Sequence, residues 1–123
     1  MLIVAASNSH LRFVTDSWLE SYSRCRDCRA IAVDVYRIVQ RDRIARCLES
    51  SRIVVATCEA DPDLVIGWAC GRVGRLHYVY VKARYRRQGV ASELVRVVCG
   101  EGPIRYSHRG RIRPPAGWVY EPI

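Results

Sequence analysis

The 123-residue sequence is almost without lysine, which supplies one of its twenty basic residues, and it has no long hydrophobic run. No stretch is long enough to span a membrane, and the first residues lack the charged and apolar regions of a signal peptide. These absences predict a cytoplasmic protein with reduced thiols. Half of the residues are hydrophobic, which excludes a disordered chain, and the length predicts one domain over residues 1–123.

The sequence also lacks a paired set of metal ligands. Cys25 and Cys28 form a lone C-x-x-C, whereas a structural zinc site needs a second pair. The other cysteines and the three histidines have no such spacing, so we predict no metal site. Cys58, Cys70 and Cys99 are instead expected to be small core residues.

The net charge of +8 lies entirely in the second half of the chain. Residues 1–70 are neutral overall, whereas residues 71–123 hold ten Arg and one Lys against three Glu. Two interpretations of this excess remain open: a basic face for nucleic acid or another polyanion, or a solvated cationic tail. The residues concerned are Arg105, Arg109, Arg111 and Arg113.

Hydrophobic periodicity and turn residues predict an alternating order of strands and helices. A strand at 2–6 precedes two helices, one with Leu11, Val14, Trp18 and Tyr22 on its apolar face, and one at about 33–48. For the second helix we expect an inward face of Val35, Tyr36, Val39, Ile44 and Leu48. Further segments are strands at 52–58, 64–71 and 76–81, a helix at 91–98, and strands at 104–108 and 118–120.

A basic turn with a glycine joins the strand at 76–81 to the helix at 91–98. The N–H groups and the dipole of a helix start favour an anion, and Gly89 lets the backbone come close to it. Arg86 and Arg87 add forked donors that match phosphate oxygens. The segment therefore predicts a phosphate site, although a tight basic turn without a ligand has the same pattern.

Arg86-Arg87-Gln88-Gly89-Val90-Ala91, after this strand, resembles the pyrophosphate-binding signature of the GNAT N-acetyltransferase superfamily. The resemblance covers residues 1–108 and implies an α/β (α+β) fold. Its central sheet is mixed and mostly antiparallel, helices flank it, and its fourth and fifth strands splay apart. The Arg-, Gly- and Pro-rich residues 109–115 cannot form the fold's usual fourth helix, so we expect a truncated C-terminal part. The end of the chain also resembles small phage-encoded GNAT-like proteins, which implies a host cytoplasm.

The resemblance implies acetyl-CoA, or another acyl-CoA, as the cofactor. Its pantetheine arm would pair with the backbone near the end of the strand, at Val79, Tyr80 and Val81. Its pyrophosphate would lie on the backbone of the turn, near the side chain of Arg86 and the hydroxyl of Ser92. The residues expected there are Arg86, Arg87, Gln88, Gly89, Val90, Ala91 and Ser92.

The general base that the resemblance implies is usually a carboxylate on a central strand. This chain has none between Asp63 and Glu93. His77 facing His108 across the splay is one hypothesis; the alternative is that His77 is a half-exposed strand residue. The other candidates for the base are Tyr78, Tyr80, Tyr106 and Glu59, and Tyr78 and Tyr80 could instead line the acceptor pocket or pack under a helix. An aromatic wall for a flat substrate, or core and edge packing, are the two interpretations of Trp68, Trp118 and Tyr120.

These features predict an N-acyltransferase that moves an acyl group directly to an amine in a ternary complex. One alternative is a GNAT-like binding protein that has lost its chemistry. Another is an acyltransferase that acts on nucleic acid through the basic half, which would require a base to be flipped out of a duplex. The acceptor, the acyl group and the oligomeric state do not follow from the sequence.

Overall fold

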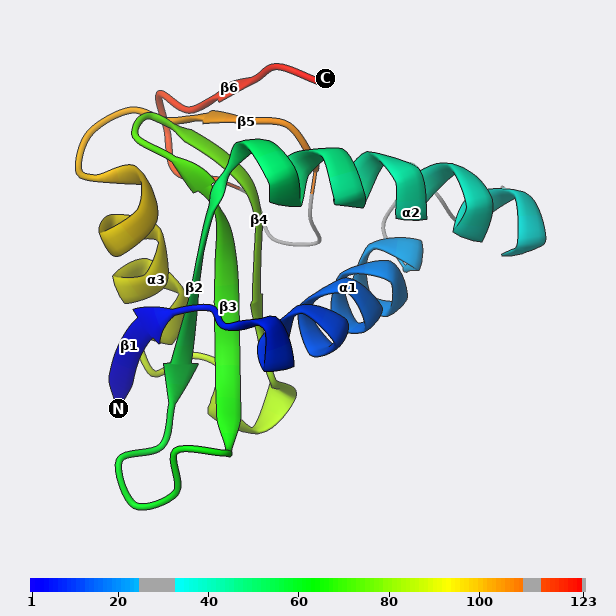
Figure 1. The fold of residues 1–123 in the computed structure, drawn as a ribbon. Helices are drawn as coiled ribbons and strands as arrows, with labels where there is room; N and C mark the ends of the chain where they lie inside the picture. Colours follow the sequence, from blue (N-terminus) through cyan, green and yellow to red (C-terminus); the bar gives the residue numbers. More distant parts are fainter. Residues whose placement is uncertain (25–32, 110–113, 123) are drawn as a thin grey trace.

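The computed structural model describes residues 1–24, 33–109 and 114–122 as a sheet covered by helices on both faces (Figure 1). In chain order its elements are β1 (Leu2–Ala5), α1 (Asn8–Ser23), α2 (Val33–Ser50), β2 (Arg52–Thr57), β3 (Val65–Arg72), β4 (Arg75–Val81), the 3-10 helix η1 (Ala83–Tyr85), α3 (Val90–Cys99), β5 (Arg105–Tyr106) and β6 (Val119–Tyr120). The predicted order of elements is confirmed. Cys25, Cys28, Arg111 and Arg113 lie outside the described residues.

The sheet has the order β1-β2-β3-β4-β5-β6, so each strand lies beside its neighbour in sequence. Strands β1 to β4 pair antiparallel, whereas β4 pairs with β5 and β5 with β6 in parallel. The pairing of β4 with β5 covers two positions, Arg75 with Arg105 and Leu76 with Tyr106. Beyond them the described chain places no strand beside β4 on that edge, which is the predicted splay of the fourth and fifth strands.

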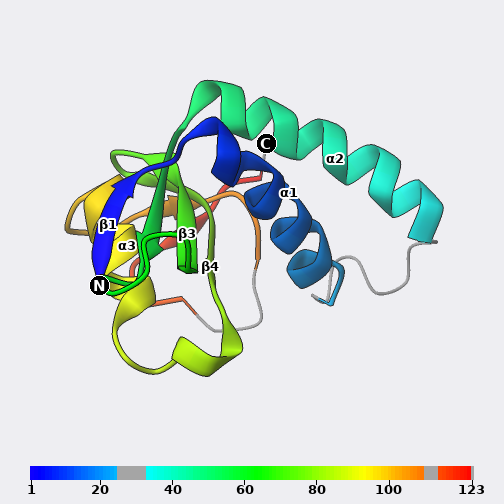
Figure 2. The same ribbon diagram turned by 60° about the horizontal axis from the view of Figure 1, so that its bottom comes forward.

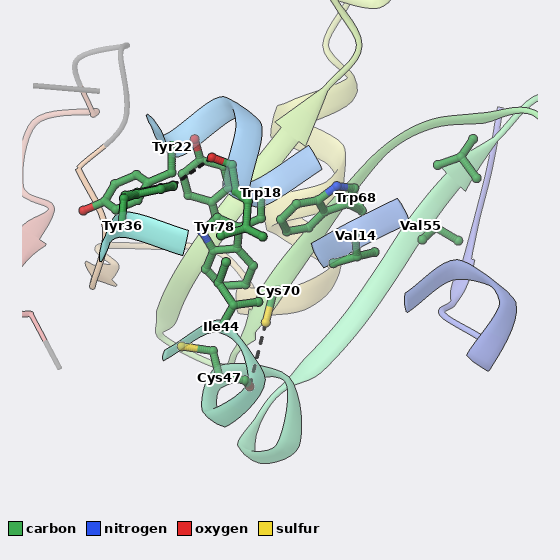
Figure 3. Close-up of a cluster of buried hydrophobic side chains, with 12 residues drawn as sticks. Val14, Trp18, Tyr22, Tyr36, Ile44, Cys47, Val55, Trp68, Cys70 and Tyr78 are labelled. Carbon is green, nitrogen blue, oxygen red and sulfur yellow. Dashed lines mark hydrogen bonds between the residues drawn. The ribbon is translucent and has the colours of Figure 1, made fainter. Parts of the chain in front are cut away.

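The two faces of the sheet carry separate apolar cores. Helices α1 and α2 cover one face and α3 the other (Figure 2). On the first face, Trp18 of α1 stacks on Tyr78 of β4 with ring centroids 5.3 Å apart (Figure 3). Trp68 of β3 donates its indole N–H to Ser17 at 2.8 Å. On the second face, α3 buries Leu94 completely against the strands.

Two local features shape the pairing of β3 with β4. A Cβ on Gly67 would stand 2.5 Å from the carbonyl oxygen of Tyr80, so only glycine fits opposite that strand. The register shifts between Cys70 and Gly71, so that His77 is the extra residue of a β-bulge in β4. The bulge places His77 and Tyr78 in succession opposite one residue of β3.

The expected inward face of α2 is partly wrong. Tyr36 and Ile44 are buried, but Val35 and Val39 are 51% and 41% exposed. The buried positions 36, 40, 44 and 47 recur at three- and four-residue spacing, and Tyr36 fixes this face by donating its hydroxyl to the carbonyl of Leu19 in α1 at 2.8 Å. The helix is therefore rotated from the expectation, because its packing against α1 overrides the apolarity of the two valines.

Two other expectations are corrected. The strand predicted at 104–108 is limited to Arg105–Tyr106, because the chain then leaves β4. The proposed aromatic wall does not form: Trp68 is fully buried beside α1, whereas Trp118 packs with Tyr106 against the second core.

The three cysteines predicted to be core residues are buried or partly buried. Cys70 and Cys99 are buried and Cys58 is partly buried. None of the described helices is long and apolar enough to cross a membrane.

Replacement of Leu94 by alanine tests the second core. The side chain is 0% exposed, so Leu94→Ala should lower the free energy of unfolding by about 2–5 kcal/mol in urea denaturation. Val73→Ala at the β3–β4 turn, where the side chain is 87% exposed, should change it by less than about 0.5 kcal/mol. Equal effects of the two substitutions would contradict the described packing of α3.

Candidate functional site

The turn between β4 and α3 presents the start of a helix to solvent. Gly89 is the N-cap residue, with a φ of 82°, and it offers no side-chain cap to the first N–H groups of α3. Arg87 also has a positive φ, of 63°, so two left-handed residues flank Gln88. Such alternating backbone turns form anion-binding concavities, and the exposed N–H groups at the helix start add to it.

Arg86 fixes this turn to the end of β4. Its Nε donates to the carbonyl of Val81 at 2.8 Å, and its backbone N–H donates to the carbonyl of Ala83 at 3.3 Å. Residues 86–89 are exposed, so the guanidinium is anchored by one nitrogen while the turn stays open to a ligand. The predicted phosphate residues thus lie together at the start of α3.

The free edge of β4 leads from this turn into the splay. Lys82 donates its N–H to the carbonyl of Ile66 in β3 at 2.9 Å, and Tyr80 lies opposite Trp68. Because backbone groups alternate between the two edges of a strand, Val79 and Val81 direct theirs away from β3. The carbonyl of Val81 already accepts from Nε of Arg86, so the backbone groups of β4 that could pair with an extended ligand are those of Val79 and the N–H of Val81. The backbone of Tyr80 pairs with β3.

A serine joins the two predicted histidines at the point where β4 and β5 part. The Oγ of Ser107 lies 2.7 Å from Nδ1 of His77 and 2.8 Å from Nδ1 of His108. All three residues are at most 8% exposed. One hydroxyl can donate to one ring nitrogen and must accept from the other, so the two neutral histidines require different tautomers.

Burial keeps both histidines neutral. The pKa of His77 is lowered to about 4, mainly by burial and additionally by the charges of Arg75 and Arg72. The pKa of His108 is also lowered to about 4, by burial and then by the charges of His77 and Arg43. At neutral pH each ring therefore has one nitrogen that can accept a proton.

Aromatic rings hold His108 in place. Trp18, Tyr22 and Tyr78 meet its ring edge-on, with centroids 5.0–6.3 Å away. Tyr78 also shares a hydrogen bond of 2.8 Å with Ser21, so its hydroxyl is directed to α1. Helix α1 thereby positions the histidine pair.

The remaining sequence candidates lie apart from this pair. Tyr80 is partly exposed, with its ring 6.2 Å from that of Trp68, and Tyr106 packs on Tyr120. The carboxylate of Glu59 pairs with the N-terminus at 3.2 Å. Tyr78 and Tyr80 do share one strand face, as expected.

Ser107 is the functional candidate that the sequence interpretation missed. Its signal was its place beside His108 in the segment expected to lie next to His77. His77 itself is 5% exposed, so it is not the half-exposed residue of the alternative interpretation.

The described basic residues of the C-terminal part have local partners. Arg105 pairs with Glu121 at 3.2 Å, and the guanidinium of Arg109 lies over the ring of Tyr120 at 4.7 Å. Among the residues of known placement, no three His, Cys, Asp or Glu side chains gather as metal ligands.

The chain is similar to known proteins in both sequence and fold. The sequence profile of the acetyltransferase (GNAT) family matches residues 12–103, whereas no curated protein matches. Three solved structures share the fold at low sequence identity.

A putative acetyltransferase from Pyrococcus furiosus is 21% identical, with a TM-score of 0.56 over 78% of this chain and 70% of its own. The apo form of YjaB from Escherichia coli is 19% identical, with a TM-score of 0.55 over 79% and 64%. A GCN5-related N-acetyltransferase from Rhodopseudomonas palustris is 11% identical, with a TM-score of 0.55 over 78% and 61%. The chain thus spans about two thirds of the length of these structures.

The histidine pair predicts a pH-dependent stability. Each folded pKa of about 4 lies below the ordinary value of 6.5, so between these values the unfolded chain binds more protons. The free energy of unfolding should be highest above pH 6.5 and fall progressively toward pH 4.

Urea denaturation at pH 7 and pH 5 measures this slope. His108→Gln should reduce the slope, whereas Val73→Ala, at the exposed β3–β4 turn, should retain it. The same slope in all three proteins would contradict a neutral buried pair.

Proposed function

This chain belongs to the acetyltransferase (GNAT) family, and on that premise we propose that it is an acyl-CoA-dependent N-acyltransferase that transfers an acetyl or related acyl group directly to an amine. The observation that carries the proposal is the exposed, glycine-capped start of α3 at the end of a strand with a free edge. A chain without a phosphate-bearing ligand has no physical need for this combination.

The residues present fit acyl-CoA. The backbone of residues 87–91 and the charges of Arg86 and Arg87 would hold its pyrophosphate, with Ser92 as a further donor. Val79 and Val81 would pair with its extended arm along the free edge of β4, beside Tyr80. When bound, the cofactor supplies an activated acyl thioester.

His77 is our candidate for the base that removes a proton from the acceptor amine. It stands where β4 and β5 part, and its ring is neutral at physiological pH. Ser107 would carry hydrogen bonding through to His108, which positions His77 and stabilises the charge that it takes up. Tyr80 is the candidate proton donor for the leaving group.

The missing carboxylate is one argument for the alternative of a GNAT-like protein without chemistry. If His77 acts as the base, that argument no longer favours the alternative. An acyltransferase for nucleic acid depends on Arg105, Arg109, Arg111 and Arg113. We make it an outcome of the tests below.

Charge reversal at Arg86 tests the cofactor site. Arg86→Glu should weaken acetyl-CoA binding at least about tenfold in calorimetric titration, because it removes a cation and the bond to Val81 that fixes the turn. Arg84→Glu makes the same charge change on exposed η1, outside the signature, and should bind nearly as wild type does. Equal losses of acetyl-CoA affinity in the two variants would mean that the change in overall charge, and not the turn, causes the weaker binding.

Substitution of His77 and of its hydrogen-bond partner Ser107 tests catalysis. With a panel of amines and thiol release as the readout, His77→Gln should lower kcat/KM by about 10²–10⁴-fold. The KM for acetyl-CoA should stay unchanged. Ser107→Ala should have a smaller effect and should shift the pH profile of kcat/KM, which a purely structural role would not do. Wild-type rates in His77→Gln would remove His77 from the mechanism.

A further inference from the structure

A basic hollow lies between the C-terminal half of α2 and the hairpin of β3 and β4. Its volume is about 540 Å³, which is within the usual range for small-molecule sites. The side chains that line it are those of Arg43, Arg46, Arg72, Arg75 and His77, together with Cys47 and Ser50. We call these residues the basic hollow.

The positive charge of the basic hollow is only partly balanced. Arg46 pairs with Asp42 at 2.9 Å on the exposed surface of α2, and Arg75 pairs with Glu121 at 3.2 Å. Within the described part of the chain, Arg43 and Arg72 have no ion pair, and no carboxylate lines the hollow. Four guanidinium groups around one concavity repel one another, and an anion placed among them would relieve this repulsion.

The hollow is separate from the phosphate turn. Arg72 and Arg75 flank the start of β4, whereas residues 86–89 follow its other end (Figure 1). Seven residues of strand separate the two by about 23 Å, so a pyrophosphate on the turn cannot fill the hollow. His77 lines the hollow and also contacts Ser107, which connects the hollow to the proposed base.

We propose that the basic hollow binds the acceptor, and that the acceptor is a small amine that carries a phosphate group. This inference rests on the proposed function and names its substrate class. Arg43 and Arg72 hold the phosphate with forked donors, and the amine faces His77. The amine nitrogen forms a bond to the acyl carbon as the carbon–sulfur bond breaks. One amine proton passes to His77 and the leaving thiolate takes up a proton, so the products are an amide and free coenzyme A.

Phosphate in the hollow would also adjust the base. The positive charges of Arg75 and Arg72 contribute to the low pKa of His77, and a bound dianion offsets them. The acceptor therefore raises the proton affinity of His77 when it binds. Ser107, His108 and Arg43 face the same region, and because Arg43 also lowers the pKa of His108, the pKa of His108 should shift in the same direction.

A set of arginines around one hollow favours a small ligand over a nucleic-acid backbone. A polymer needs a row of cations along an open surface. Of the arginines considered for nucleic acid, the two that the structure describes, Arg105 and Arg109, lie against Glu121 and Tyr120.

The test uses the full chain and three amines that share a 2-aminoethyl group: O-phosphoethanolamine, β-alanine and ethanolamine. Each is titrated into the protein with coenzyme A present, and binding is followed by calorimetry and by the NMR signals of His77. The double variant Arg43→Gln/Arg72→Gln removes the two cations without an ion pair. Arg41→Gln on the same helix, exposed and outside the hollow, is the matched control.

We expect O-phosphoethanolamine to bind at least about tenfold more tightly than the other two amines, with a dissociation constant near 1 mM or below. The double variant should lose this preference and Arg41→Gln should keep it. In the wild type, O-phosphoethanolamine should raise the pKa of His77. Equal binding of all three amines, or binding equally strong in the double variant, would overturn the proposal.

Two further arms separate this inference from the proposed function. Acetyl-CoA binding without any O-phosphoethanolamine binding would overturn the inference and leave the acyltransferase proposal standing. O-phosphoethanolamine binding without acetyl-CoA binding would overturn both, because the hollow would then have no acceptor role. A single-stranded oligonucleotide that binds the wild type but not the double variant, with no binding of the phosphoamine, would assign the hollow to nucleic acid instead.

Discussion

The unequal pairing of β4 is the constraint on which the rest of the structure depends. One edge is paired with β3 along the strand, and the other meets β5 at two positions only. An unpaired strand edge leaves backbone N–H and C=O groups without hydrogen-bond partners. Here the unpaired stretch of β4 ends at the start of α3, whose N–H groups favour an anion. The unpaired strand edge and the anion site follow one another from the splay to Gly89. A single elongated ligand with a phosphate group would therefore bind to both.

Packing on the two faces of the sheet maintains this arrangement. On one face Trp18 stacks on Tyr78 and holds α1 over β4, and the same tryptophan contacts His108. On the other face Leu94 and Val90 bury α3, which fixes the direction of its first turn. The β-bulge at His77 contributes to this arrangement, because the titratable ring of His77 lines the basic hollow and does not belong to either apolar core.

Local signals in the sequence predicted the parts that local physics decides. The signature from Arg86 to Ala91 and the apolar strand before it gave the turn, the helix start and the family. The orientation of α2 was missed because Val35 and Val39 are apolar yet exposed, and only the contact of Tyr36 with α1 decides the rotation. The hypothesis that His77 faces His108 came from the sequence. The position of the Ser107 hydroxyl between them and the basic hollow depend on segments far apart in the chain, so they required the tertiary structure.

Hydrogen–deuterium exchange of the full chain, with and without acetyl-CoA, tests the central claim most directly. The account predicts slower exchange at the amides of Val79 and Val81 and of residues 87–92 when acetyl-CoA is added, with little change in β1 and β2. Protection confined to other segments, or no protection at saturating acetyl-CoA, would contradict the assignment of this edge and turn as the cofactor site.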